Sequence, residues 1–333
     1  MASRYWVAGS GNWSDNTNHW SASSGGAAGA SKPTSADAVL FDASSFSGAG
    51  QTVTVDETSS CLSMDWTGAT NSPTLAYNAA LSFYGNVTFI TAMNITGSGD
   101  FISAGAGNTL TMAGQDLTNR LLVNSGVLTL LDTFLSSGFG DVTMNGGTLD
   151  TNGQTVTTRN FVLQGATGKT LTMGASTINC AAWNYSGTNL TLTANTATIN
   201  VSGTGAGAFG NVNYNGATFN FNGTAHTLSG SPTGIAALNF KPSGAQTITA
   251  TGTTQTVATA SRTGTGLITI VGGTWVKTGG GIIVLNRLSI SNSTAMPGST
   301  WYAVGSTNGG GNSGWVWYQQ QGIVNKLVGA GVI

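Results

Sequence analysis

A short alternating phrase returns along the middle of this chain at nearly constant intervals. Each copy is an Asn between two apolar residues, and successive copies begin 21, 20 and 19 residues apart, at 178–180, 199–201, 219–221 and 238–240. On a strand this alternation sends both apolar side chains to one face and the Asn to the other. A strand that recurs about every 20 residues, with no helix-length segment between copies, predicts a parallel β-solenoid.

The repeat also predicts where particular side chains point. We expect Ile178, Ile199 and Phe219 to face the interior on stacked strands, about 4.8 Å from copy to copy. A second phrase of the same kind competes for the last copy, because it occurs at 183–185, 212–214 and 238–240. The boundaries of the coils therefore stay open. At about 20–30 residues per coil, residues 50–290 hold about ten coils, and we find no helical periodicity before residue 319.

The composition favours an ordered, β-rich chain. Only 6% of the residues are charged, against roughly 25% in ordinary soluble domains, but 40% are hydrophobic and these alternate with polar residues, unlike disordered chains. Stacked strands favour neutral side chains, because like charges about 4.8 Å apart repel each other. The net charge of -1 predicts no basic stripe for nucleic acid. No apolar run reaches the ~20 residues that membrane insertion needs.

The sequence divides into three predicted segments. Residues 1–45 contain Trp6, Trp13 and Trp20 at seven-residue intervals among Gly, Asn and Ser. We expect these rings to be largely buried, as an aromatic cap on the first coil or against a neighbouring subunit, because the open end of a solenoid needs cover. Residues 46–292 form the predicted β-solenoid. Residues 293–333 form a C-terminal aromatic module with a short apolar tail.

The C-terminal module holds the candidate binding residues. Its aromatic side chains could stack on sugar rings, although a hydrophobic end cap is the favoured interpretation. Its apolar tail is predicted to dock on a partner protein or on the tails of other copies, because an exposed apolar patch favours association. The alternative is that the tail folds back on its own solenoid. The candidate residues are Trp301, Tyr302, Trp315, Trp317, Ile323, Leu327 and Val328.

No group of residues has the spacing that catalysis requires. Asp132 and Asp150 lie 18 residues apart, near one coil step, and could form a glycosidase-like pair, but isolated turn aspartates are favoured. His19 and His226 have no neighbouring Cys or acid at metal-ligand spacing. Residues 165–170 resemble a phosphate-binding loop, but position 163, where its first glycine would stand, is a Leu. The sequence therefore predicts no catalytic residue, no cofactor and no metal.

Two acids and two thiols have structural interpretations. Asp37 and Asp42 flank the first apolar strand and could hold Ca²⁺ with loop carbonyls, but local turn hydrogen bonds are favoured. Cys61 and Cys180 are 119 residues apart in strand-like contexts, and we expect buried small hydrophobes rather than a disulfide. The first ten residues lack the layout of a secretory signal, so we expect synthesis in a cytoplasm without export through a signal peptide.

Both ends of the chain resemble a group of tailed-bacteriophage β-solenoid proteins. The similar N-terminal phrases are RYWVAGSGNWSD at 4–15, NHWS at 18–21 and PTSAD at 33–37, and the similar C-terminal phrases are WYA at 301–303 and GNSGW at 311–315. The resemblance implies a virion-associated surface protein of parallel β-helix type, with trimeric assembly as an expectation of the family. It carries no catalytic residues, and it leaves tail fibre, tailspike and capsid decoration open.

These observations lead to one hypothesis about the function and to two alternatives. We expect a structural protein of a phage virion that contacts capsid or tail proteins, forms a homotrimer and meets a host-surface glycan, without nucleic acid and without membrane insertion. The first rival is a tailspike enzyme that degrades polysaccharide, which would need a carboxylate pair in a groove. The second rival is a bacterial surface adhesin, which would need an export signal and usually a membrane barrel.

Overall fold

The structure is a computed structural model, and it describes residues 1–319. These residues form strands, bridges, turns and bends but no helix, as the missing helical periodicity predicted. The strands stack as a parallel β-solenoid of about 13 turns. The predicted fold class is therefore confirmed.

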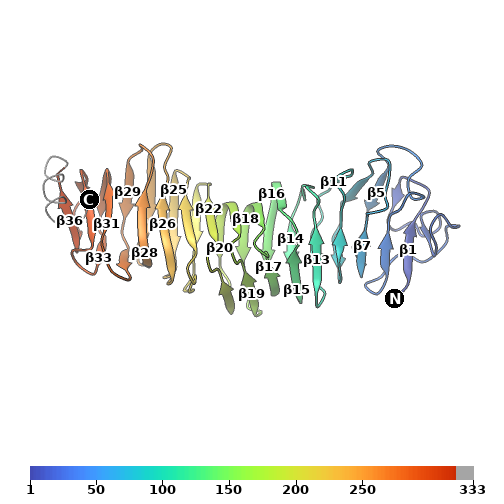
Figure 1. Cartoon of the computed structure of the whole chain (residues 1–333), viewed down its shortest axis with the longest axis horizontal. Helices are drawn as coiled ribbons and strands as arrows, with labels where there is room; N and C mark the ends of the chain where they lie inside the picture. Colours follow the sequence, from blue (N-terminus) through green and yellow to red (C-terminus); the bar gives the residue numbers. More distant parts are fainter. Residues whose placement is uncertain (320–333) are drawn as a thin grey trace. The chain divides into compact units, whose positions relative to one another are not determined.

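The chain divides into two compact units. Unit 1 comprises residues 1–178 and 187–191, and unit 2 comprises residues 179–186 and 192–333. Within each unit the strands of successive turns lie side by side, blue to green in unit 1 and yellow to red in unit 2 (Figure 1). The predicted segment boundaries after residues 45 and 292 fall inside these units and stay predictions.

The strands of unit 1 form three sheets, and they pair in parallel apart from the antiparallel pair β1–β3. The first sheet contains β3 (Trp20–Ser21), β1 (Ser3–Trp6), β4 (Ala38–Leu40), β7 (Ser63–Asp65), β10 (Val87–Thr88), β13 (Asn108–Thr111), β15 (Val127–Leu130), β17 (Gly147–Asp150), β19 (Lys169–Thr172) and the start of β21 (Leu190–Thr193). The second contains β2 (Gly11–Asn12), β5 (Thr52–Val55), β8 (Thr74–Tyr77) and β11 (Asn94–Thr96). The third contains β6 (Ser59–Cys61), β9 (Leu81–Phe83), β12 (Phe101–Ser103), β14 (Leu121–Val123), β16 (Phe134–Met144) and β18 (Thr155–Leu163).

Alternating residues build the core of unit 1. In β5, Val53 and Val55 are fully buried, and the two threonines between and beside them stay partly exposed. This is the pattern of a half-buried strand, in which successive side chains point to opposite faces. Turns between strands use residues that tolerate a left-handed backbone: Asn152 and Gly153, between β17 and β18, have φ angles of 51° and 73°. The Asn-Gly pair therefore makes this turn without strain.

An aromatic cluster lies at the beginning of unit 1. Trp6, Trp13 and Trp20 are all 0% exposed, so the predicted burial of the three rings is confirmed. Trp20 meets the other two edge to face, with ring centroids 5.0 Å from Trp6 and 4.8 Å from Trp13. Its Nε1 also donates a hydrogen bond to the carbonyl oxygen of Trp13, 2.7 Å away. Such pairs add specific geometry to a large buried apolar area.

The strands of unit 2 repeat in columns. The first column contains Asn179 and Cys180 of β20 (Thr177–Tyr185), then β22 (Thr198–Val201), β24 (Thr218–Phe221), β26 (Ile235–Phe240) and the second half of β28 (Thr254–Arg262). The second contains the end of β20, then β23 (Gly205–Ala208), β25 (Ala225–Ser229), β27 (Gln246–Thr249), β29 (Ile268–Val271), β32 (Leu288–Ser291) and β35 (Thr307–Asn308). The third contains the first half of β28, then β30 (Thr274–Lys277) and β33 (Thr294–Met296). A separate sheet contains β31 (Ile283–Asn286), β34 (Trp301–Val304) and β36 (Trp315–Tyr318).

Long strands carry the chain around a corner from one column to another. In β28, residues 254–257 pair with β30, and residues 259–262 pair with β26. The two halves therefore belong to different columns. The sheet continues through the corner because the strand does not break there.

The Asn repeat forms a real column in unit 2, which we call the asparagine column: Asn179, Asn200, Asn220 and Asn239. Strand pairing sets Ile199 opposite Phe219, and Phe219 opposite Leu238. Ile178, Ile199, Phe219 and Leu238 are all 0% exposed. The predicted inward orientation is therefore confirmed, and the predicted stacking is confirmed for the copies whose strands pair.

The competition between the two registers is resolved by strand pairing. Leu238 lies opposite Phe219, so residues 238–240 belong to the asparagine column. The other phrase is not a stacked set, because Trp183 lies opposite Gly207 in β23 rather than opposite residues 212–214. Both phrases show the same alternation of apolar and polar residues. Only the number of residues in each corner decides which copies stack on one another.

Candidate functional site

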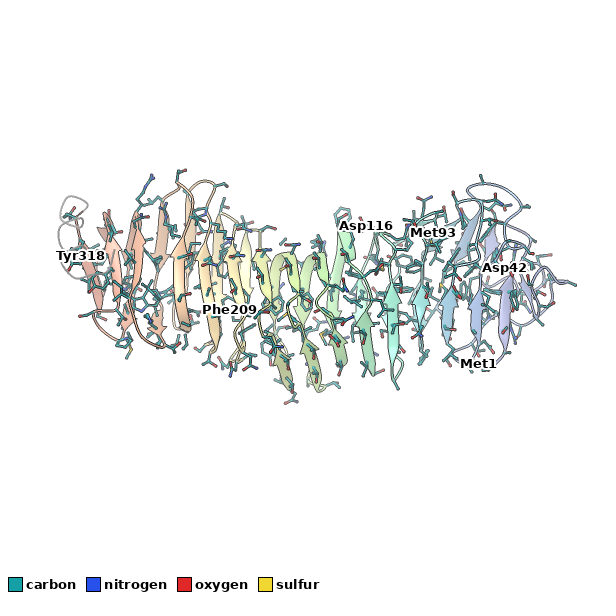
Figure 2. All side chains as sticks on the ribbon, viewed as in Figure 1. Met1, Asp42, Met93, Asp116, Phe209 and Tyr318 are labelled. Atoms are coloured by element: carbon teal, nitrogen blue, oxygen red, sulfur yellow. The ribbon has the colours of Figure 1, made fainter. Side chains whose placement is uncertain are left out.

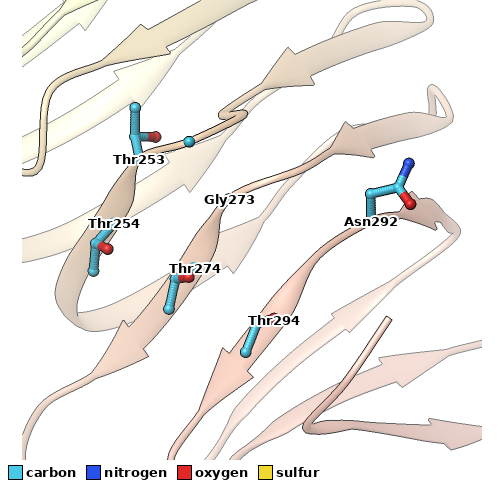
Figure 3. Close-up of a pocket in the computed structure, with 7 residues that line it drawn as sticks. Thr253, Thr254, Gly273, Thr274, Asn292 and Thr294 are labelled. Atoms are coloured by element: carbon cyan, nitrogen blue, oxygen red, sulfur yellow. The ribbon is translucent and has the colours of Figure 1, made fainter. Parts of the chain in front are cut away.

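A polar groove of about 340 Å³ opens on unit 2 (Figure 3). One wall is a column of three threonines on successive strands, which we call the threonine column: Thr254, Thr274 and Thr294. Strand pairing sets Thr254 opposite Thr274, and Thr274 opposite Thr294. The full lining is Gly252, Thr253, Thr254, Gly273, Thr274, Asn292 and Thr294.

The groove owes its form to the corner that precedes the threonine column. Gly252, Gly273 and Asn292 occupy this corner with φ angles of 74°, 84° and 51°, a region that glycine and asparagine tolerate best. A Cβ at Gly273 would stand 2.7 Å from the Cβ of Ala250, so a larger residue does not fit there. The corner therefore stays narrow and exposes backbone beside the hydroxyl groups.

The chemistry of the groove is that of neutral hydrogen bonding. Its side chains supply hydroxyl groups and one amide, and none of the lining residues carries a charge. Such groups can bind hydroxylated or amide-bearing ligands, but they cannot act as general acid or base near neutral pH. Sequence reasoning missed this column, although the signal was available in the constant step of 20 residues between Thr254, Thr274 and Thr294.

The predicted C-terminal aromatic set is only partly exposed. Trp301 is 0% and Trp315 is 7% exposed, and their rings meet at 5.5 Å inside unit 2. These two rings are therefore not exposed for the alternative of stacking on sugars. They occupy inward positions of β34 and β36, and strand pairing places them opposite each other. Both belong to the core, which agrees with the interpretation of the module as a hydrophobic end cap.

The neighbouring aromatic residues are half-buried. Tyr302 and Tyr318 point outward from β34 and β36 and stack with ring centroids 5.6 Å apart, and Figure 2 labels Tyr318 on the last described strand. Trp317 lies opposite Ala303 and is also half-buried. Tyr302 and Trp317 are the candidate residues that stay partly accessible, and Tyr318 lies beside Tyr302. The predicted docking residues Ile323, Leu327 and Val328 lie outside the described residues.

The two acids considered as a catalytic pair have separate hydrogen-bond partners. Asp132 accepts hydrogen bonds from the backbone amides of Met112 and Ala113, at 2.7 and 2.6 Å. Asp150 lies opposite Thr129 rather than opposite Asp132, because strand pairing is offset from the simple coil step. The 18-residue spacing therefore does not stack the two acids, and the isolated-aspartate interpretation is confirmed.

The two acids considered for Ca²⁺ also serve turns. The carboxylate of Asp37 accepts hydrogen bonds from the backbone amide and the hydroxyl of Thr34, at 3.1 and 2.8 Å. That of Asp42 accepts one from the amide of Ser44, at 2.8 Å. The turn interpretation is confirmed for both. Across residues 1–319, no group of three or more His, Cys, Asp or Glu side chains is placed to hold a metal ion.

The histidines are core residues. His19 is 8% exposed and stacks on Trp6 with ring centroids 4.7 Å apart. His226 is 2% exposed and lies 4.7 Å from the ring of Phe221. Burial lowers the pKa of His226 to about 4, so it is neutral at physiological pH. Neither ring is placed for proton transfer to a ligand in solvent.

The loop that resembles a phosphate site is closed by its own lysine. Lys169 is 2% exposed, and its ammonium group donates to the carbonyl oxygens of Gly165, Thr167 and Thr188 at 3.0, 2.9 and 2.8 Å. Carbonyl oxygens would repel a phosphate, so the rejection of a phosphate loop is confirmed.

The two thiols are buried. Cys61 is 0% and Cys180 is 3% exposed, as predicted for small hydrophobic core residues. Burial raises the pKa of Cys61 to about 12, which keeps it protonated and unreactive.

Comparison with protein-family models, with curated proteins and with solved structures found no match for this chain. Over residues 1–319, no helix is long and apolar enough to cross a membrane.

Proposed function

We propose that this protein is a structural component of a bacteriophage particle, displayed on its surface, which binds rather than cleaves. The observation that carries the proposal is the stack of parallel turns with an aromatic cluster at its beginning and neutral polar columns on its outside. A stack of this kind provides a stiff surface with regularly spaced hydrogen-bonding groups, and the fold does not by itself supply a catalytic site. The N-terminal and C-terminal phrases that resemble phage β-solenoid proteins support the location.

Binding is favoured over catalysis by what the accessible groove contains. Its hydroxyl and amide groups can meet the hydroxyl groups of a surface glycan. The rival tailspike enzyme needs two carboxylates across a cleft, and within residues 1–319 the candidate pair, Asp132 and Asp150, does not come into register. Assembly as a homotrimer, and docking of the apolar tail on capsid or tail proteins, belong to the same proposal.

The test is to locate the chain on particles. Virions of the phage that encodes the chain are purified on a density gradient, and the chain is quantified by mass spectrometry and labelled with antibody for electron microscopy. We expect it in constant ratio to the major capsid protein and at one place on the particle. A phage lysis protein serves as the non-structural control. Recovery of the chain only in the soluble lysate, with that control, would overturn the proposal.

A further inference from the structure

The charges of this chain are separated along the sequence in a way that its net charge of -1 conceals. Residues 1–150 hold all eleven acidic residues and three of the ten basic ones. Residues 151–333 hold the other seven basic residues and no acid. Every residue of unit 2 lies in this second part, so unit 2 has lysines and arginines but no carboxylate side chain.

Three of these cations gather at one corner of unit 2, which we call the basic corner: Lys241, Arg262 and Arg287. Lys241 directly follows Phe240, and strand pairing sets Phe240 opposite Arg262. One turn further on, Nη1 of Arg262 donates a hydrogen bond to Oδ1 of Asn286, 2.7 Å away, and Arg287 is the next residue. The basic corner therefore spans three successive turns.

The side chains of the basic corner are accessible. Lys241 and Arg287 are exposed, and Arg262 is half-buried. The backbone of Arg287 has a φ of 52° at the turn between β31 and β32, which marks the sharp corner where the chain changes column. Burial is the main cause that lowers the pKa of Arg262, and the positive charge of Arg287 is the second. The positive charges of Arg262 and Arg287 thus repel each other, and an anion placed between them would remove that repulsion.

In unit 1, by contrast, two arginines pair with aspartates of neighbouring turns. Where its chain passes into the third sheet, charges of alternating sign occupy successive turns: Asp100, Arg120, Asp141 and Arg159. Arg120 Nε donates to Asp100 at 2.9 Å, and Arg159 donates two hydrogen bonds to Asp141, at 3.0 and 3.1 Å. A matched stack of this kind stabilises itself. The basic corner has no such partner in its own unit, so its positive charge is available to a ligand.

The surroundings of the basic corner indicate which anion fits. On one side lie neutral polar residues of the first column, where Ser261 donates a hydrogen bond to Asn239 at 2.7 Å. On the other side the second column presents hydroxyl groups, with strand pairing in the order Thr247, Thr269, Ser289. Cations flanked by hydroxyl and amide groups match a polymer that carries both anionic groups and many hydroxyls. Nucleic acid would favour denser positive charge with aromatic rings interleaved for its bases.

We propose that the basic corner, Lys241, Arg262 and Arg287, binds an anionic polysaccharide, a sugar chain that bears sulfate, phosphate or carboxylate groups. The proposal rests on the proposed function, since a displayed surface is what meets such a polymer. Lys241 and Arg287 contact the anionic groups, and Arg262, held by Asn286, fixes the middle position. The neutral polar residues on either side contact the sugar hydroxyls.

The test uses the purified full chain and two polymers of equal length, dextran sulfate and neutral dextran. We expect dextran sulfate to bind with an affinity that falls steeply as salt rises, and neutral dextran to bind at least tenfold more weakly, because the anionic groups carry most of the attraction. Lys241→Gln combined with Arg287→Gln should weaken dextran sulfate binding at least tenfold. Lys32→Gln, which removes an exposed cation that pairs with Glu57 in unit 1, is the matched control and should bind unchanged.

Any result other than these overturns the proposal. Equal binding of both polymers removes the need for charge, and an equal loss in Lys32→Gln shows that the corner is not the site. A single-stranded DNA of matched charge that binds as tightly as dextran sulfate would assign the corner to nucleic acid. Because the assay needs no particle, its failure is distinct from a failure to find the chain on virions. Thermal unfolding of each variant verifies that the fold is intact.

Discussion

Asn200 donates a hydrogen bond through Nδ2 to Oδ1 of Asn179, 2.8 Å away and one turn earlier. The same bond repeats from Asn220 to Asn200 at 2.7 Å and from Asn239 to Asn220 at 2.9 Å. Each inner amide thus donates to one neighbour and accepts from the other. An amide can do this at every turn without accumulating charge, which explains why Asn rather than an ionised residue occupies the column.

Replacing Asn220 by Ala should weaken unit 2 locally. Asn220 is 5% exposed and stands in the middle of the asparagine column, so its loss leaves both neighbours without their amide partner. An unsatisfied buried polar group costs about 1–3 kcal/mol. Hydrogen–deuterium exchange should become faster in β22, β24 and β26 and stay unchanged in β5. Asn222→Ala, at an exposed position two residues further on, is the control. Equal effects of the two variants would contradict the role of the column.

Replacing Trp13 by Ala should destabilise unit 1 strongly. The ring is 0% exposed and packs against Trp20, and the loss of a buried aromatic side chain costs about 3–5 kcal/mol. Trp13→Phe should lose less, because the indole nitrogen of Trp13 is buried without a hydrogen-bond partner in residues 1–319. Urea unfolding followed by tryptophan fluorescence measures both. If Trp13→Ala left the midpoint unchanged, the ring would be a surface feature rather than a core residue.

Acid should destabilise unit 2 through His226. Burial lowers the pKa of His226 to about 4, against about 6.5 in an unfolded chain, so the unfolded state takes up the proton first as the pH falls. The stability that the neutral ring contributes is therefore present above pH ~6.5 and is lost as the pH falls towards 4. Thermal midpoints of the wild type and of His226→Phe, measured from pH 7 to pH 4, should show the steeper fall in the wild type. Parallel curves would show that His226 does not titrate in this way.

Purified protein should leave polysaccharide chains intact. The carboxylate of Asp132 is occupied by two backbone amides, and Asp150 is not its neighbour. Incubation with capsular polysaccharide of the host, followed by size-exclusion chromatography with light scattering, should give an unchanged chain length. A shortening that disappears in Asp132→Asn or in Asp150→Asn would instead support the enzyme.

The sequence by itself determined the strands and the direction of their side chains. Alternation of apolar and polar residues in 178–180, 199–201 and 219–221 was enough to predict the solenoid and the burial of Ile178, Ile199 and Phe219, because it depends only on the period of two that every strand shares. The burial of the three N-terminal tryptophans followed from their size and spacing in a polar segment.

Only the tertiary structure decided which residues stand opposite each other. Corners of varying length shift the register from turn to turn, so a spacing near one coil did not bring Asp132 to Asp150, and it left two registers competing for Leu238. The same reason hid the basic corner, because Lys241, Arg262 and Arg287 are 21 and 25 residues apart in sequence. Only the pairing of β26 with β28 and the hydrogen bond from Arg262 to Asn286 bring them together. Periodicity is a local property of the chain, whereas register is set by contacts between turns.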